Sequence, residues 1–297
     1  MLLTLSIILA ILLPIGVLGY ALYQGLFFVW AILLSLATLL AVVAIFCVII
    51  LILLPLLGKH FEKKEDPSDP KRWRFMTDVA KFSCFWLGIR IYVHGMEKLP
   101  PHMTYVFYSN HQSYIDPLIY HAAFSKIPHA TMYKKVIDRY IFAGPMARAL
   151  GGVSIDRDDD REAMESVVRI IQKVKKGVHF SIYPEGTRSR GIGLHHFKAG
   201  SFKIAQKSGG TLVLCALDGS YRKRLSIPFC YTPVHIEIVE VMTSEEAKNY
   251  PTHELATHCE LQVKEAITKM RHTYPHMRPS KRYVRRFEEQ QKIEDVF

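Results

Sequence analysis

The stretch that decides the fold is residues 104–123, which read TYVFYSNHQSYIDPLIYHAA. Its first part, up to Ser109, is mostly apolar and aromatic, a composition that favours a buried strand. Polar residues from Asn110 onward interrupt this run, and a helical segment is expected from Pro117. A strand that leads through a polar turn into a helix is the repeating unit of an α/β layer fold.

The chain after residue 88 continues to alternate in this way. Further strands are expected at 89–94, 130–133, 153–155, 179–183, 211–217 and 234–241. Further helices are expected at 76–87, 137–150, 160–176, 200–207 and 254–272. The alternation predicts an α/β fold with a largely parallel central sheet flanked by helices. Functional groups of such sheets lie where strands end, and Asn110, Asp156 and Pro184 occupy such positions.

The amino-terminal part has a different composition. Residues 1–58 contain no Asp, Glu, Lys or Arg, and two apolar segments, 2–23 and 26–54, meet at Gln24-Gly25. About 20 apolar residues cross a bilayer core of ~30 Å, so these segments predict an N-terminal two-helix membrane anchor, with a kink at Pro14. A shallow hairpin that dips into one leaflet is the alternative.

Charge is confined to the remainder of the chain. The formal net charge of +11 therefore belongs to residues 59–297. Lys59, Lys63, Lys64 and Lys71 follow the second apolar segment, and by the positive-inside rule the globular part of this integral membrane protein is cytoplasmic. A basic domain on an apolar anchor indicates membrane lipids and anionic substrates as partners. Nucleic acid is disfavoured because the basic residues are dispersed and the chain begins with a membrane segment.

These features divide the chain into four parts. The division is a membrane-embedded hairpin at 1–58, a linker with an interfacial helix at 59–87, an α/β domain at 88–277 and a basic-then-acidic tail at 278–297, expected to be partly ordered. The linker itself is expected over 59–73, where Asp66-Pro67 and Asp69-Pro70 are expected to interrupt helical structure. The cysteines are Cys47, Cys84, Cys215, Cys230 and Cys259. They form no Cys-x-x-Cys pair and are expected to be reduced and buried.

His111 and Asp116 are the first candidates for catalysis. A strand delivers His111 to the edge of the sheet, and a helix that starts near Ser113 or Tyr114 places Asp116 one turn in. The carboxylate can then hold one imidazole nitrogen and leave the other free to accept a proton from a hydroxyl group. The alternative is a capping Asn110 followed by a structural His–Asp pair.

The run Tyr183-Pro-Glu-Gly-Thr-Arg188 is the second candidate site. Arg188 offers a planar fork for a phosphate, Thr187 and the backbone around Gly186 offer further donors, and Glu185 is expected to orient the arginine. The alternative is an ordinary turn with a surface arginine.

Two weaker candidates precede this run. Arg157 could bind an anion, or pair with Asp156 or Asp158. Lys134 is adjacent to Lys135, and a solvated pair of lysines is the alternative there.

Several other motifs are absent. His253 and His258 lie five positions apart and do not share a helix face, so a metal site is not expected. No glycine-rich nucleotide motif and no Gly-x-Ser-x-Gly elbow occurs in the chain. The sequence therefore predicts neither a metal nor another bound cofactor. It also argues against a serine hydrolase, because the motif that would carry the nucleophilic serine is absent.

Taken together, the motifs resemble those of the 1-acylglycerol-3-phosphate acyltransferase family. The resemblance runs from about residue 89 to residue 241 and rests on ordered blocks. These blocks are Gly95-Met-Glu-Lys-Leu-Pro100, the Asn110-His111-x4-Asp116 block, the segment 151–157 and the segment 183–188. The stretch 213–217 lacks the proline of the family's fourth block, and Val136 and Ile141 replace a usual acidic residue and proline.

The resemblance implies a function and a set of site residues. It implies that His111 is the general base, that Asp116 orients it, and that the acceptor's glycerol phosphate is bound by residues of the later blocks. The residues implied in substrate binding are Asn110, Lys134, Arg157, Glu185, Gly186, Thr187 and Arg188. The α/β domain would then be an acyltransferase domain that moves a fatty acyl group from acyl-CoA or acyl carrier protein to lysophosphatidic acid, giving phosphatidic acid. Another lysophospholipid acceptor, such as lysophosphatidylcholine or lyso-cardiolipin, and a non-catalytic lipid-binding module are the alternatives.

Overall fold

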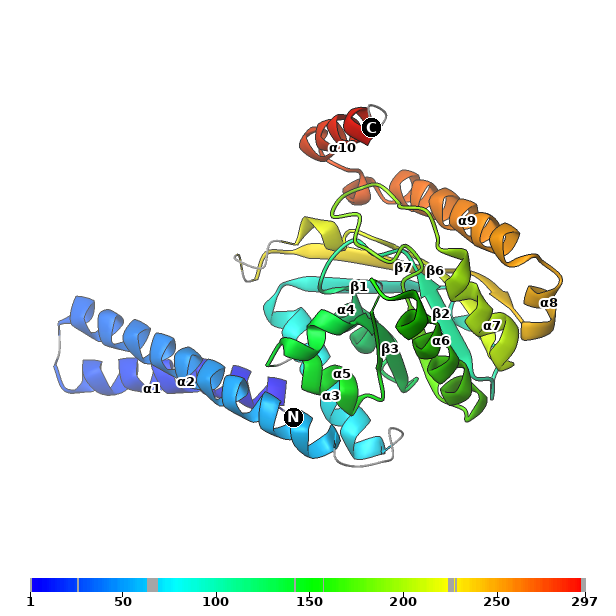
Figure 1. Cartoon of the computed structure of the whole chain (residues 1–297). Coiled ribbons are helices and arrows are strands. Elements are labelled where there is room, and N and C mark those ends of the chain that lie inside the picture. Colours follow the sequence, from blue (N-terminus) through cyan, green and yellow to red (C-terminus); the bar gives the residue numbers. More distant parts are fainter. Residues whose placement is uncertain are drawn as a thin grey trace.

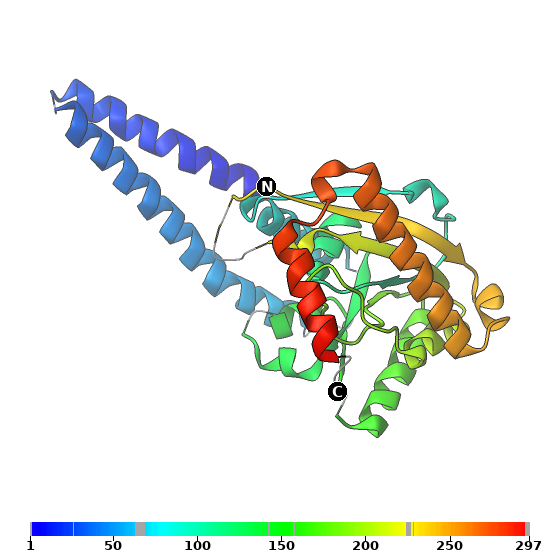
Figure 2. The ribbon, with the colours of Figure 1, turned by 90° about the horizontal axis from the view of Figure 1, so that it is seen from above.

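The computed structural model describes residues 2–25, 27–62, 69–141, 143–156, 158–223, 227 and 229–294. It consists of a helical hairpin and an α/β body, and the hairpin projects from one side of the body (Figures 1 and 2). The hairpin contains α1 (Leu2–Tyr23) and α2 (Phe28–Glu62). At its base, α1 packs against α3 (Pro70–Trp86) and α2 packs against α5 (Ala143–Ala149).

The turn of the hairpin lies where the sequence predicts it. Gly25 has a φ of 74°, a conformation that glycine adopts without steric cost, and the Gly25 N–H donates to the carbonyl oxygen of Leu22. The Ser35 hydroxyl donates to the carbonyl oxygen of Pro14 at 2.9 Å and joins the two helices. The predicted end of the second segment near Pro55 is wrong, because α2 continues to Glu62. A proline inside a helix removes one N–H donor but can be accommodated without ending the helix.

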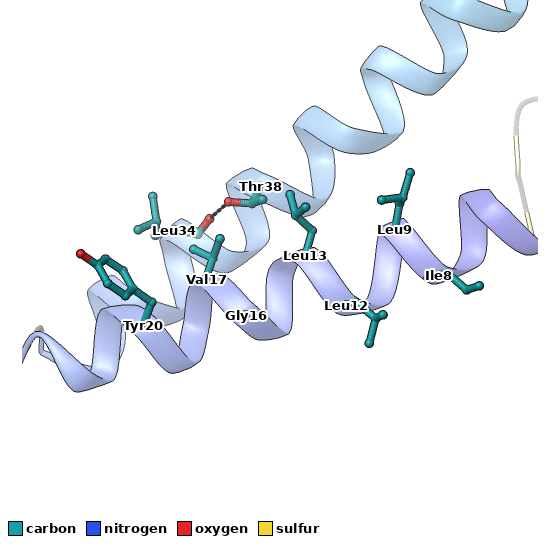
Figure 3. A pocket seen from close by; sticks show the side chains of 9 residues that line it. All are labelled: Ile8, Leu9, Leu12, Leu13, Gly16, Val17, Tyr20, Leu34 and Thr38. Atoms are coloured by element: carbon teal, nitrogen blue, oxygen red, sulfur yellow. Dashed lines mark hydrogen bonds between the residues drawn. The ribbon is translucent and has the colours of Figure 1, made fainter.

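The outer surface of the hairpin is apolar. Phe28–Ile45 is long and apolar enough to cross a membrane, and Ile8–Tyr23 forms a shorter apolar helix. A groove of about 690 Å³ lies between the two helices, beside Gly16 and Thr38, and Figure 3 shows the side chains that line it. The Thr38 hydroxyl donates to the carbonyl oxygen of Leu34 at 2.8 Å, so this polar group in the groove is satisfied within its own helix.

The body contains a seven-stranded sheet in the order β1-β7-β6-β2-β5-β3-β4. The strands are β1 (Ile89–His94), β2 (Tyr105–Ser109), β3 (His129–Lys134), β4 (Val153–Ile155), β5 (His179–Ile182), β6 (Thr211–Asp218) and β7 (Thr232–Met242). All neighbouring strands are parallel except β6 and β7. The predicted α/β fold with a largely parallel sheet is therefore confirmed.

Helices cover both faces of this sheet. In addition to α3 and α5, the body contains the helices α4 (Asp116–Ala123), α6 (Asp160–Lys175), α7 (Lys203–Ser208), α8 (Ser244–Lys248) and α9 (Thr252–Thr273), and a last helix, α10 (Lys281–Glu294), that lies apart from the sheet (Figure 1). Helices α6, α7 and α9 share one core with Val106 and Tyr108 of β2, whereas α3 and α4 share the other with Tyr105 and Phe107. Both faces of β2 are thus buried, which explains why its sequence is continuously apolar.

Helix α3 differs from its prediction, and the predicted breaker Asp66-Pro67 lies outside the described residues. Asp69 and Pro70 start this helix instead of breaking it, because the Asp69 carboxylate accepts the Lys71 N–H at 2.9 Å and proline is favoured in the first helical turn. Trp73 and Met76 are buried against Leu150. This part of the predicted interfacial face is therefore covered by protein.

The segment 137–150 is not one helix. It contains the 3-10 turn η2 (Lys135–Arg139) and the short helix α5. Pro145 has no N–H and its ring clashes with the preceding helical turn, and a Cβ at Gly144 would clash with the backbone of Asp138. The predicted helix 200–207 likewise divides into a 3-10 turn, η3 (Ala199–Phe202), and α7.

Two further predictions need correction. The tail forms a regular helix, α10, over much of the segment that was expected to be partly ordered. Cys84, Cys215 and Cys259 are buried free thiols whose pKa values burial raises to about 12, but Cys230 is exposed. Cys230 lies in the loop before β7, where its side chain is exposed. The side chain of Cys47 lies outside the described residues.

Candidate active site

The site begins where β2 ends. The chain leaves the sheet at Asn110, turns through Ser113 and enters α4 at Asp116, whose N–H donates to the carbonyl oxygen of Ser113. The sequence predicts that Asp116 lies one turn inside the helix. In the structure it is instead the first residue of the helix. This position turns its carboxylate back toward His111.

His111 and Asp116 form a hydrogen-bonded pair. The distance from His111 Nδ1 to Asp116 Oδ2 is 2.7 Å, and Asp116 is completely buried while 17% of the His111 side chain is exposed. Asp116 Oδ2 also accepts the backbone N–H groups of Gln112 and Ser113, at 2.7 and 2.8 Å. An oxygen that accepts three hydrogen bonds needs a donor at Nδ1, so this nitrogen carries the proton and Nε2 is the free acceptor.

The second motif holds His111 from the other side. The ring of Tyr183 stacks on the His111 ring, with centroids 4.3 Å apart and an interplanar angle of 22°. The Ser189 N–H donates to the His111 carbonyl oxygen at 2.8 Å, and the His111 N–H donates to Glu185 Oε1. The fold thus brings the two predicted motifs together around one histidine.

Glu185 has a role other than the predicted one. It is 2% exposed, and its second oxygen accepts the His195 N–H at 2.8 Å, so the carboxyl group joins the loop after β5 to the loop after β2. Among the described residues, the Glu185 carboxyl group accepts hydrogen bonds from these two backbone N–H groups and not from Arg188. Burial raises the pKa of Glu185 to about 8, against the opposing effect of the two hydrogen bonds.

Arg188 lies over the ring of Tyr114, 3.1 Å from the ring centroid. Tyr114 belongs to the turn between His111 and Asp116, so the guanidinium group is held close to the histidine. Gly186 has a φ of 74° and permits the tight turn before Arg188. Thr187 is exposed. The cation–π contact leaves the polar edge of the guanidinium group available for an anion.

Asn110 is a positioning residue and not the predicted substrate contact. Its side chain is fully buried, donates to the Leu217 carbonyl oxygen at 2.8 Å and accepts the Leu217 N–H at 2.7 Å. These two bonds fix the end of β2 to β6. Because the amide is completely buried, it is not accessible to a ligand that approaches from solvent.

A buried polar network below the histidine was missed by sequence reasoning. The Gln112 side chain donates to Asp218 Oδ1 at 2.9 Å, and Arg271 of α9 binds both Asp218 oxygens, at 2.8 and 2.9 Å. Arg271 also donates to the Ile192 carbonyl oxygen at 3.1 Å. Asp218 directly after an apolar strand is a local signal, but nothing near Arg271 in sequence indicates its partner.

The remaining predicted residues lie farther along the sheet edge. Lys134 is exposed at the end of β3 and pairs in register with Ile155 of β4. The strand order puts β5 between β3 and β2, so Lys134 lies two strands from His111, roughly 10 Å at the usual strand spacing. Arg157 lies outside the described residues, and its role stays a prediction. Among the described residues, no group of three or more metal-ligating side chains lies together.

An apolar groove of about 610 Å³ opens beside the histidine. It passes between α6 and the segment of η3 and α7, and Tyr183, which stacks on His111, forms part of its wall. Its other lining residues include Met132, Ile155, Met164, Val168, Ile171, Gly186, Lys198 and Lys203. The groove therefore has a largely hydrocarbon surface with lysines in its lining, and its lining residue Tyr183 stacks on His111.

The fold and this site define a class of protein. Residues 90–218 match the family model described as Acyltransferase. This match and the relatives below confirm the predicted resemblance to the 1-acylglycerol-3-phosphate acyltransferases.

Individual relatives agree with this assignment. The chain is 32% identical over 138 residues to the 1-acyl-sn-glycerol-3-phosphate acyltransferase of Borreliella burgdorferi, covering 46% of this chain and 55% of that protein. It is 32% identical over 163 residues to the chloroplastic enzyme LPAT1 of Arabidopsis thaliana, covering 51% and 43%. The chain thus spans about half the length of these relatives. The crystal structure of the LPA acyltransferase PlsC from Thermotoga maritima superposes with a TM-score of 0.58 at 24% identity, over 75% of this chain and 88% of that one, and shows the same fold.

Proposed function

We propose that this protein transfers a fatty acyl group from a thioester donor to the free hydroxyl group of lysophosphatidic acid, which gives phosphatidic acid. The observation that carries the proposal is the 2.7 Å pair between His111 and the buried Asp116, with Arg188 and an apolar groove beside it. The relatives named above support the choice of acceptor, since each is named a 1-acyl-sn-glycerol-3-phosphate acyltransferase.

The chemistry follows from the geometry of the pair. His111 Nε2 takes the proton of the acceptor hydroxyl group as the oxygen attacks the thioester carbonyl carbon. Asp116 stabilises the resulting imidazolium, because its carboxylate already accepts the Nδ1 hydrogen. The tetrahedral intermediate then expels the thiolate, which takes the proton back from Nε2. No acyl-enzyme is required.

The two substrates differ in the groups that would hold them. The phosphate of the acceptor suits Arg188, because a guanidinium group can bind a phosphate through two parallel hydrogen bonds. The donor's hydrocarbon chain suits the apolar groove, whose wall includes Tyr183. These placements bring the hydroxyl group and the thioester together at His111.

The hairpin supports a membrane location with both helices spanning. Helix α1 has 22 residues, which at 1.5 Å per residue is about the thickness of a bilayer core. Tyr20, Tyr23 and Trp30 lie near the turn between α1 and α2 and are at least 63% exposed. Such aromatic side chains favour the membrane–water interface. The basic residues after α2 favour a cytoplasmic body. Both amphiphilic substrates could then reach the site without leaving the membrane surface.

The test measures turnover of purified protein in detergent with labelled acyl-CoA and a panel of lysophospholipids. His111→Ala and Asp116→Asn are each expected to lower kcat by roughly 10²–10⁴-fold while the melting temperature stays close to wild type. The double variant should lose no more than the worse single variant, because the two residues act as one unit. Near-normal turnover in His111→Ala contradicts the mechanism. Faster turnover of lysophosphatidylcholine or lyso-cardiolipin than of lysophosphatidic acid would show that the proposed acceptor is wrong.

A further inference from the structure

A second concave surface lies beyond the site described above, under the C-terminal helix. Helix α10 is on the opposite side of the body from α3 and α5 (Figures 1 and 2). Tyr283 meets Tyr221 edge-on, with centroids 4.9 Å apart and an angle of 85°. Phe287 occupies the space that a Cβ at Gly193 would need. These contacts fix α10 against the loop that follows Arg188.

The cavity between α10 and this loop has a volume of about 910 Å³ and is strongly basic. Its cations are Lys281, Arg282, Arg285, Arg286 and Arg190. Glu289 is the one acidic residue of the lining, and it pairs with Arg285 at 2.9 Å. Within the described parts of the chain, no carboxylate lies within ion-pair distance of the other four. The alternative is that α10 simply exposes a basic face to solvent, which would explain the cations of α10 but not Arg190.

Arg190 makes the arrangement more than one face of a helix. It comes from a different element, and its φ of 55° lies in a region that residues other than glycine rarely adopt. Tyr221 is 9% exposed and forms a wall with Tyr283. A cavity with several unpaired cations and an aromatic wall matches a ligand that has several phosphates and a flat ring, since guanidinium groups bind phosphates and aromatic rings stack on bases.

The cavity is connected to the catalytic residues through two loops. Arg190 follows Ser189, whose N–H donates to the His111 carbonyl oxygen. Tyr221 follows Ser220, whose hydroxyl group donates to the Gln112 side chain at 3.4 Å. Both loops that line the cavity are therefore hydrogen-bonded to the segment that carries His111. The acceptor phosphate is a poorer match, because a single phosphate would leave most of the cations unpaired.

We infer that this cavity binds the nucleotide end of an acyl-CoA donor, with its phosphates on Arg190, Arg282 and Arg286 and its adenine beside the tyrosine pair. The inference rests on the proposed function and selects acyl-CoA over acyl carrier protein as the donor. The pantetheine arm would carry the thioester from the cavity to His111, and the acyl chain would continue into the groove beside Tyr183.

The test uses the full-length protein in detergent and the double variant Arg282→Gln/Arg286→Gln. Binding of adenosine 3′,5′-bisphosphate is measured by calorimetry, and kcat/KM is measured with acyl-CoA and with the acyl thioester of pantetheine, which lacks the nucleotide. The variant should bind the bisphosphate at least ~10-fold more weakly, and its ratio of kcat/KM for acyl-CoA over the pantetheine thioester should fall by a similar factor. Lys175→Gln/Lys176→Gln, which removes two exposed charges at the end of α6, is the matched control and should change neither quantity.

Four results would overturn the inference. They are unchanged bisphosphate binding, an equal loss with both thioesters, a loss confined to acyl carrier protein as donor, and a rise in KM confined to the lysophospholipid. The last two would assign the cavity to an acidic protein or to the acceptor. If the wild-type protein turned over no donor, the proposed function would fail, while bisphosphate binding would still report on the cavity.

Discussion

Glu185 joins the two motifs of the site through a single carboxyl group. It accepts the N–H groups of His111 and His195, so it determines where the backbone of His111 lies. A residue that acts in this way should affect both stability and rate, because it touches neither substrate in the proposed mechanism but positions the base.

Glu185→Gln is expected to destabilise the protein by ~1–3 kcal/mol and to lower kcat. The glutamine side chain keeps one acceptor oxygen, and its NH₂ group must face the other N–H donor, which leaves a buried donor unpaired. Thermal unfolding and turnover check this. Glu260→Gln is the control, because Glu260 accepts the Phe197 N–H in the same way but lies away from His111. A full effect on stability with unchanged kcat would limit Glu185 to a structural role.

Arg188→Ala should weaken the acceptor far more than the donor. The loss of a charge-assisted hydrogen bond of ~1.5–3 kcal/mol corresponds to a roughly 10- to 150-fold rise in the KM of lysophosphatidic acid. Initial rates with each substrate varied in turn provide the measurement. Arg188→Lys keeps the charge and loses the planar fork, so its acceptor KM should be intermediate. The proposed binding of the acceptor phosphate by Arg188 is refuted if Arg188→Ala leaves both the KM and the kcat for the acceptor unchanged.

At the scale of elements, the hairpin is the part that differs most from a soluble α/β domain. Leu12, Phe28 and Leu40 expose more than half of their side chains on its outer surface. Residues of its base pack against α3 and α5, so the hairpin is continuous with the body. Its function is therefore expected to be delivery of the site to lipid, with some contribution to the fold.

Full-length protein should stay on vesicles through a high-salt wash, because salt does not screen the burial of apolar surface. Residues 59–297 alone should be released as ionic strength rises. Gln24→Cys at the turn distinguishes the two membrane arrangements. A membrane-impermeant thiol reagent should label it only from the side opposite the body if both helices span the bilayer. Release of the full-length protein by salt would refute the anchor, and failure of residues 59–297 to fold would show that the hairpin completes the core.

At the scale of the whole molecule, two histidines are buried together between the sheet and its helices. His129 and His121 stack with centroids 4.5 Å apart, beside Trp73. Burial lowers the pKa of His129 from 6.5 to about 4, and it lowers that of His121 as well. The folded protein thus keeps these rings neutral where an unfolded chain would protonate them.

Stability should fall as the pH decreases from 7 to 4. In this range the unfolded state binds more protons than the folded state, so the free energy of unfolding rises with pH. For His129 the difference between 6.5 and about 4 corresponds to about 3 kcal/mol. Glu185, whose pKa is raised, changes the free energy of unfolding with pH in the opposite direction. The pH dependence of wild type is therefore compared with that of His129→Asn, in which the contribution of Glu185 is the same. Denaturant unfolding at several pH values should give a shallower pH dependence for the variant, and equal slopes would refute the assignment.

The sequence by itself determined the alternation of strands and helices, the hairpin with its turn at Gly25, and the two motifs around His111 and Arg188. Each of these depends on apolar periodicity, turn chemistry or the spacing of a few neighbouring residues, which are local properties. The starts of α3 and α4 were misplaced because a proline and an aspartate that interrupt a pattern can equally begin a helix.

Only the tertiary structure decided which polar groups face each other. Glu185 meets the backbone of His111 and not Arg188, Asn110 meets Leu217, and Arg271 meets Asp218. These partners are 53 to 107 positions apart in the sequence. Their distances depend on the strand order, in which β6 and β5 lie on either side of β2. No local pattern specifies that order, because it arises from the packing of whole elements, and the same packing places α10 beside the loop after Arg188.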